Sequence, residues 1–273
     1  MMNRRTLLLS GLALAFANAP AAAQRFQPTR FSVEVIGRGP DVILIPGLTS
    51  GREVWRPIAS AGPGYRYHLI QVSGFAGEAA RGNRAGPVVG PVANELARYI
   101  ADRRLVRPAI IGHSMGGTLA MMVAARRPEL VGKLMVVDMY PQPAGLLGGT
   151  AQSFSPFADI MASPGGRRLF ANLMGAFSPP DVAGRSDPDV VGRAVHDLAA
   201  TDLTGELPNI RAPFTIVYAS PDPQARVALD RSFTRAYVAA RHPRFVRIDG
   251  SGHMVMLDQP ARLRAAIREF LAR

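Results

Sequence analysis

A single serine stands at a bend between two apolar segments of the chain. Residues 108–112 (PAIIG) are rich in isoleucine, residues 115–125 (MGGTLAMMVAA) are rich in alanine and methionine, and Ser114 lies between them. Residues 112–116 (GHSMG) fit the pattern G-x-S-x-G, in which a tight turn from strand to helix exposes the serine hydroxyl at the carboxyl end of a sheet. We call this turn the elbow. Side chains two residues before and after the serine would collide in such a turn, so glycine is needed at both places. We predict that Ser114 is a nucleophile.

A serine hydroxyl needs a base to remove its proton. In chains built on this turn the order is serine, then acid, then histidine. His68 precedes the serine, His113 lies on the opposite side of the bend, His196 falls in a predicted insertion, and His242 lies in a polar connection. His253 remains, on a glycine-containing loop after the last predicted strand. We predict that His253 is the base and that His113 packs against or orients its neighbours.

The base needs an acid that orients its other ring nitrogen. Asp222 follows the penultimate predicted strand, in FTIVYASPDPQ, and is the first choice. Asp138, at the end of KLMVVD, is the alternative because it would approach the same histidine from the neighbouring strand. Either aspartate would otherwise be an ordinary ion-paired residue of a turn.

Acyl transfer also needs two hydrogen-bond donors for the oxyanion. The backbone N–H of Met115, at the start of the elbow helix, is one candidate. The N–H of Leu48 is the other, because Gly47 permits a sharp turn after the strand DVILIPG. Loss of one such donor typically costs about 3 kcal/mol of transition-state stabilisation.

Short apolar runs alternate with helical patterns over most of the chain, which predicts an α/β fold with a mostly parallel, doubly wound sheet. Strands are expected at residues 30–37, 41–47, 67–73, 108–112, 133–138, 214–219 and 244–249. Apolar residues at helical spacing in residues 87–105 and 258–273 predict two amphipathic helices. Asp258 is expected to cap the second of these helices, and Pro260 suits its first turn.

Two segments depart from this alternation. Residues 1–23 hold a basic pair, an apolar run and small residues before Gln24, the pattern of a secretory signal. Arg4-Arg5 favours the twin-arginine export route no more than the general one. Residues 140–210 are rich in glycine, proline and apolar side chains and are predicted to form a helical cap. The core of the α/β fold would then comprise residues 24–139 and 211–273.

The composition limits the classes of partner. The formal net charge is +12, Lys133 is the one lysine, and the arginines are scattered along the chain. That scatter favours a solvated surface over a nucleic-acid site, with an anionic partner as the alternative. The apolar run of the signal is too short to span a bilayer, so no stable membrane insertion is expected after cleavage. The chain has no cysteine, which excludes disulfides and thiolate metal sites.

The segments GHSMGG, PDP and GSGHMVMLDQP together make the chain resemble the α/β-hydrolase superfamily, in its small cap-bearing branch of serine esterases. Two departures separate it from that pattern. Pro46-Gly47 stands where His-Gly is usual before the oxyanion residue, and QVSGFAG replaces the usual Asp-x-Arg-Gly-x-Gly loop. The resemblance implies a catalytic triad but leaves the substrate open, because this fold hosts many reactions.

The leading hypothesis is an exported serine hydrolase, in the bacterial periplasm or outside the cell, that cleaves a small carboxylic ester. Met115 and the apolar residues of the insertion suggest a moderately hydrophobic acyl group. Neither a metal nor a cofactor is expected, because no ligand cluster or phosphate loop is present. The alternatives are a perhydrolase or haloperoxidase without cofactor, a thioesterase or amidase with the same triad, or a binding protein that has lost turnover. The sequence does not predict an oligomeric state.

Overall fold

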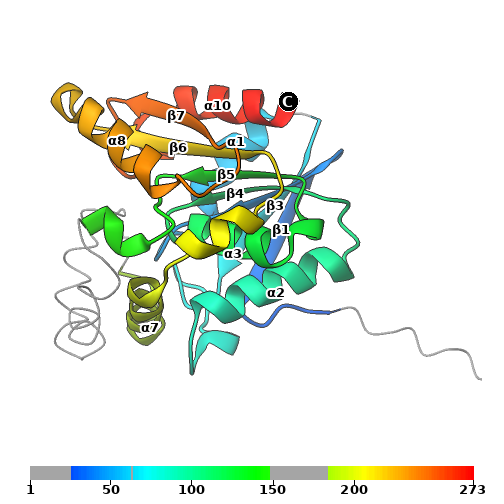
Figure 1. Ribbon diagram of the computed structural model, residues 1–273. Coiled ribbons are helices and arrows are strands. Elements are labelled where there is room, and N and C mark those ends of the chain that lie inside the picture. Colours follow the sequence, from blue (N-terminus) through cyan, green and yellow to red (C-terminus); the bar gives the residue numbers. More distant parts are fainter. Residues whose placement is uncertain (1–25, 63, 148–183) are drawn as a thin grey trace, which may run out of the picture.

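A seven-stranded sheet crosses the centre of the computed structural model, which describes residues 26–62, 64–147 and 184–273 (Figure 1). The strand order is β1-β3-β2-β4-β5-β6-β7, and β1 alone runs antiparallel to its neighbour. The strands are β1 (Phe31–Gly37), β2 (Asp41–Ile45), β3 (Arg66–Val72), β4 (Ala109–His113), β5 (Lys133–Val137), β6 (Phe214–Ser220) and β7 (Arg244–Asp249). The structure therefore confirms the mostly parallel sheet.

Helices cover both faces of this sheet, so that it is doubly wound. Figure 1 shows α1 and α10 on one face and α2 and α3 on the other. The α-helices are α1 (Arg56–Ala61), α2 (Val89–Asp102), α3 (Met115–Arg126), α7 (Pro188–Ala200), α8 (Arg226–Ala236), α9 (Val255–Asp258) and α10 (Pro260–Ala272). Short 3-10 helices are η1 (Arg52–Trp55), η2 (Arg81–Asn83), η3 (Pro128–Leu130), η4 (Pro143–Leu147), η5 (Thr204–Asn209) and η6 (Pro223–Ala225). Two apolar clusters, one on each face, form the core.

The strand and helix that flank Ser114 lie in the middle of this core. Every residue of β4 is buried, as expected for a central parallel strand that is covered on both faces. Every residue of α3 except the last is buried as well. Glycine and alanine residues along α3 let its backbone approach the sheet closely. The turn between β4 and α3 is therefore held by packing on all sides.

Glycine is required on both sides of Ser114, but for two different steric reasons. A Cβ atom at Gly112 would overlap the carbonyl oxygen of Gly116, which is the collision that the sequence predicts. A Cβ atom at Gly116 would instead overlap the carbonyl oxygens of Ile45 and Pro46, at the end of β2. The second glycine thus allows α3 to begin directly beside the neighbouring strand.

The apolar faces predicted for the two amphipathic helices are confirmed. Buried side chains in α2 include Val92, Leu96, Tyr99 and Ile100, and those in α10 are Leu263, Ile267, Phe270 and Leu271. Pro260 stands in the first turn of α10 as expected.

The prediction that Asp258 is the N-cap residue of α10 is wrong. Gln259 occupies the N-cap position without a side-chain cap bond. Asp258 ends the preceding helix α9, and its Oδ2 atom accepts the Gly252 N–H at 2.8 Å. Its carboxylate therefore stabilises the loop that carries His253 through this hydrogen bond.

The predicted signal segment, residues 1–23, lies outside the described residues, and so does most of the predicted cap. The described parts of residues 140–210 include η4, α7 and η5. Val190, Ala194 and Val195 of α7 are buried in the same apolar cluster as α2 and α3. This part of the insertion completes the core.

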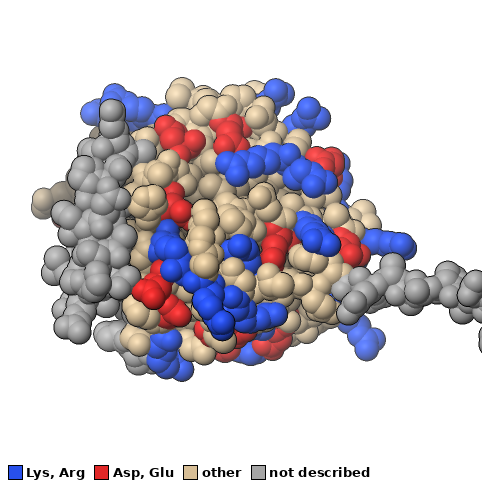
Figure 2. All heavy atoms as spheres, turned by 90° about the horizontal axis from the view of Figure 1, so that it is seen from below, with Lys and Arg blue, Asp and Glu red and all other residues tan. Residues whose placement is uncertain are grey.

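Charged side chains of both signs are interspersed over the face seen in Figure 2. Arg126 pairs with Glu206 at 2.8 Å, and Arg127 pairs with Glu129 at 2.7 Å. Water screens such exposed pairs, so they contribute little to stability. No helix among the described residues is long and apolar enough to cross a bilayer.

The elbow makes a steric prediction. Substitution of Gly112 by alanine places a methyl group against rigid backbone, so we expect Gly112→Ala to lower the free energy of unfolding by about 2 kcal/mol or more. Gly90 in α2 is the matched control, since a Cβ atom there meets open space. Gly90→Ala should keep or slightly raise stability. Urea midpoints of the two variants measure the difference, and equal midpoints would contradict the steric account.

Candidate active site

Ser114 and Asp138 occupy equivalent positions at the carboxyl ends of two neighbouring strands. β4 and β5 pair in parallel over five residue pairs that end with His113 opposite Val137. Ser114 and Asp138 are the first residues after these strands, and the Ser114 N–H donates to the Val137 carbonyl at 3.0 Å. Both residues have a left-handed backbone, with φ of 52° and 51°. Non-glycine residues rarely adopt this conformation, and such strain concentrates at functional sites.

The carboxylate of Asp138 connects this edge of the sheet to the loop after β7. One oxygen, Oδ1, accepts the Ala219 N–H from β6 at 2.9 Å. The other, Oδ2, lies 2.7 Å from Nδ1 of His253. Since a carboxylate only accepts, His253 Nδ1 carries the hydrogen. In the neutral ring Nε2 then keeps its lone pair, which is the form that a general base needs.

Asp222, the first choice for the orienting acid, does not fill that role in the structure. It lies two residues beyond the end of β6, between Pro221 and Pro223, and its side chain is the N-cap of η6. Its Oδ1 accepts the Gln224 N–H at 2.8 Å. The single hydrogen on His253 Nδ1 is directed at Asp138 instead. The structure thus brings Asp138, the alternative candidate, to His253, whereas Asp222 caps η6.

The two expected oxyanion donors belong to the loop after β2 and to the start of α3, which meet at the elbow. A Cβ atom at Gly47 would lie 3.1 Å from the Ser114 Cβ, so the loop after β2 passes directly beside the serine. Thr49 in this loop has a left-handed backbone, with φ of 61°, and its hydroxyl donates to the Leu48 carbonyl at 2.7 Å. Met115 is the first residue of α3, where backbone N–H groups have no partner within the helix.

The side chain of Met115 is fully buried in the core cluster beneath the elbow. The expected contribution of Met115 to a hydrophobic acyl site stays a prediction. The apolar residues of the insertion that complete that expectation lie outside the described residues.

Several contacts that sequence reasoning missed hold the His253 loop. His113 Nε2 lies 2.8 Å from the His253 carbonyl oxygen. The Gln259 amide donates to the Gly250 carbonyl at 2.9 Å, and Asp258 accepts the Gly252 N–H. The His113 contact joins residues 140 positions apart, so no local pattern in the sequence signals it.

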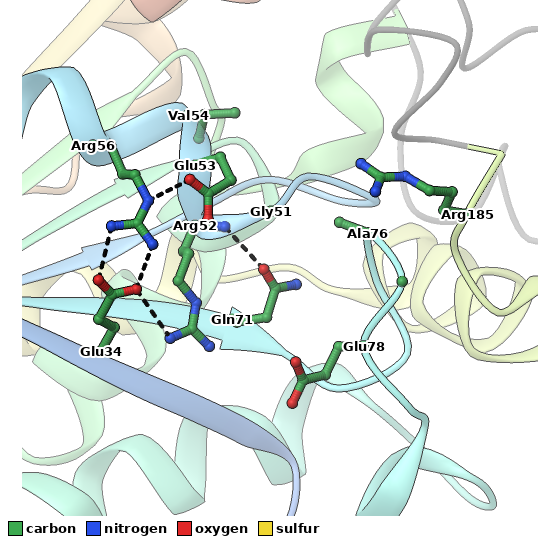
Figure 3. Close-up of a pocket in the computed structure, with 11 residues that line it drawn as sticks. Glu34, Gly51, Arg52, Glu53, Val54, Arg56, Gln71, Ala76, Glu78 and Arg185 are labelled. Carbon is green, nitrogen blue, oxygen red and sulfur yellow. Dashed lines mark hydrogen bonds and ion pairs between the residues drawn. The ribbon is translucent and has the colours of Figure 1, made fainter.

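A separate pocket of about 450 Å³ lies at the edge of the sheet near β1 and β3 (Figure 3). Charged side chains dominate its wall, and they pair with one another. Arg56 donates two hydrogen bonds to the Glu34 carboxylate, at 2.7 and 2.6 Å. Ser114, Asp138 and His253 are not among its lining residues. This pocket is therefore distinct from the arrangement around Ser114.

Comparison with known proteins identifies the family and the fold. The model of a family described as "Alpha/beta hydrolase family" matches residues 42–266. A protein from Vibrio vulnificus (strain YJ016), named pimeloyl-[acyl-carrier protein] methyl ester esterase, is 24% identical over 246 residues, which cover 82% of this chain and 91% of the relative.

Two solved structures share the fold. The enol-lactonase from Burkholderia xenovorans LB400 has a TM-score of 0.69 at 18% identity and covers 89% of this chain and 96% of its own. A thermophilic esterase from Thermogutta terrifontis has a TM-score of 0.68 at 22% identity, and the match covers 92% of this chain and 98% of the esterase. At these identities the likeness establishes the fold alone.

Proposed function

The chain belongs to the alpha/beta hydrolase family, and from that premise we propose that it is a serine hydrolase that cleaves carboxylic esters through an acyl-enzyme. One observation carries the proposal. The 2.7 Å contact between Asp138 Oδ2 and His253 Nδ1 lies at the strand end next to the strained, glycine-flanked Ser114. Nucleophile, base and acid thus come from the ends of β4, β7 and β5.

In the proposed reaction, Ser114 Oγ attacks the ester carbonyl carbon while His253 Nε2 takes the hydroxyl proton. Asp138 holds Nδ1–H and stabilises the imidazolium. The N–H groups of Leu48 and Met115 donate to the oxyanion. Collapse of the tetrahedral intermediate breaks the carbon–oxygen bond of the ester, and His253 returns the proton to the departing alcohol. Water then repeats the sequence on the acyl-serine and releases the acid.

The choice of ester over amide or thioester rests on the relatives. The Vibrio vulnificus protein is named as a methyl ester esterase, and solved structures of the same fold include an esterase and an enol-lactonase. Each of these names describes an acyl–oxygen bond as the substrate. We therefore propose a small-molecule ester as the substrate.

Covalent labelling tests the nucleophile. A fluorophosphonate should label the folded wild-type protein once, at Ser114, and Ser114→Ala should lose both labelling and ester turnover. A panel of p-nitrophenyl esters of graded acyl length supplies the activity assay. Removal of a triad serine typically lowers kcat by about 10⁶-fold. A folded wild-type protein that stays unlabelled, or ester turnover that survives in Ser114→Ala, would refute the proposal.

A pair of asparagine variants tests the acid. Asp138→Asn keeps the shape of the side chain but removes its charge and favours the wrong histidine tautomer, so kcat should fall by roughly 10²- to 10⁴-fold. Asp222→Asn is the matched control and should keep activity within about twofold, because an uncharged amide oxygen still caps η6. The reverse ranking of the two variants would assign the acid to Asp222.

We also propose that the enzyme is exported to the bacterial periplasm or beyond. Arg4-Arg5, the apolar run that follows and the small residues before Gln24 support this. The exported protein from a bacterium that expresses the full chain should begin at Gln24 on N-terminal sequencing. Protein that stays in the cytoplasm and begins at the initiator methionine would contradict the export proposal.

A further inference from the structure

The ring of His113 lies between two loops of the proposed active site. On one side, the rings of His113 and His253 have centroids 4.7 Å apart, and His113 Nε2 is 2.8 Å from the His253 carbonyl oxygen. On the other side, a Cβ atom at Gly47 would lie 3.0 Å from His113 Nδ1. His113 is 1% exposed. One buried ring therefore contacts the loop that carries the base and lies beside the loop proposed to carry an oxyanion donor.

The hydrogen bonds identify which ring nitrogen carries the proton. A backbone carbonyl only accepts, so His113 Nε2 must donate to the His253 oxygen. Nδ1 is then unprotonated in the neutral ring. Within the described part of the chain this buried nitrogen has no hydrogen-bond partner. Protonation of Nδ1 would leave a buried donor unsatisfied, so the environment favours the neutral Nε2–H tautomer.

We propose that His113 is a positioning residue whose neutral ring holds the main chain of His253, so that the His253 side chain stays aligned between Asp138 and Ser114. The inference rests on the proposed function and assigns a task to a residue next to the nucleophile. His113 acts through the loop and does not itself exchange a proton with the substrate.

Burial keeps this ring uncharged over the working range of the enzyme. Loss of hydration, followed by repulsion from His253, lowers the pKa of His113 to about 3. Two carboxylates also face the base loop: Asp138 bonds the His253 ring, and Asp258 bonds the Gly252 N–H. His253 can therefore become positive during the reaction beside an uncharged neighbour. A change in pH between about 5 and 8 therefore leaves His113 uncharged.

Two amide variants separate this role from mere packing. The amide nitrogen of His113→Gln reaches about as far as the imidazole Nε2 and restores the donor. The amide of His113→Asn reaches only to the Nδ1 position and leaves the His253 carbonyl without its bond. Another buried histidine supplies the control. His68 on β3 contacts Asp41 and Tyr99, at 2.8 and 2.7 Å, away from the proposed site.

The measurements are kcat, KM, the pH profile of kcat/KM, and the urea midpoint. We expect His113→Asn to lower kcat roughly 10- to 100-fold, since a misplacement of about 1 Å can cost this much, with KM within about twofold. The acid limb of its pH profile should move to lower pH, because a loosened Asp138 contact stabilises the His253 imidazolium less. His113→Gln should recover most of kcat, and the acid limb of its pH profile should lie at the wild-type position. His68→Asn should lose stability but keep the wild-type limb.

Other outcomes overturn the inference. If His113→Asn unfolds at lower urea but keeps the kcat and acid limb of the wild type, His113 only packs the core. If His113→Asn does not fold, His113→Gln still decides, because a folded Gln variant with a reduced kcat and a displaced limb contradicts the positioning role. Failure of the proposed function looks different, since wild-type protein would then neither react with a fluorophosphonate nor hydrolyse the esters.

Discussion

The hydrogen bond between Asp138 Oδ2 and His253 Nδ1 joins the middle of the sheet to the loop after its last strand. The bond is possible because the parallel register of β4 and β5 ends both strands at the same level and places Asp138 next to Ser114. Its second oxygen is occupied by the Ala219 N–H, so the carboxylate is held from two sides. Each proposed catalytic role follows from this contact, because it decides which nitrogen of His253 faces the substrate.

Strained backbone conformations surround this bond, and the buried core maintains them. Ser114 and Asp138, directly after β4 and β5, and Thr49, in the loop after β2, all adopt left-handed backbone angles. Such conformations cost roughly 1–3 kcal/mol each and persist only where the rest of the structure compensates. Here the compensation comes from the fully buried β4 and the nearly fully buried α3. A stable core thus maintains strain at the edge where the chemistry is proposed.

Much of this arrangement could be predicted from the sequence. The glycines around Ser114 predict the elbow, although only the clash at Gly112 is local, since Gly116 is required by the end of the neighbouring strand. The seven strands follow from their apolar runs. The order of residues along the chain points to His253. The choice between Asp138 and Asp222 needed information of another kind, since both follow a buried strand. It depends on strand register and on the capping bond that turns Asp222 toward Gln224. The contacts of His113 and Asp258 with the His253 loop depend on the packed tertiary structure, which no short pattern encodes.

The Asp138–His253 bond can be observed without an activity assay. A proton held between an imidazole Nδ1 and a carboxylate is shifted far downfield in the proton NMR spectrum, away from the amide region. Such a resonance is expected in the wild-type protein and in Asp222→Asn, and its loss is expected in Asp138→Asn. A downfield resonance that persists in Asp138→Asn and disappears in Asp222→Asn would contradict the central assignment.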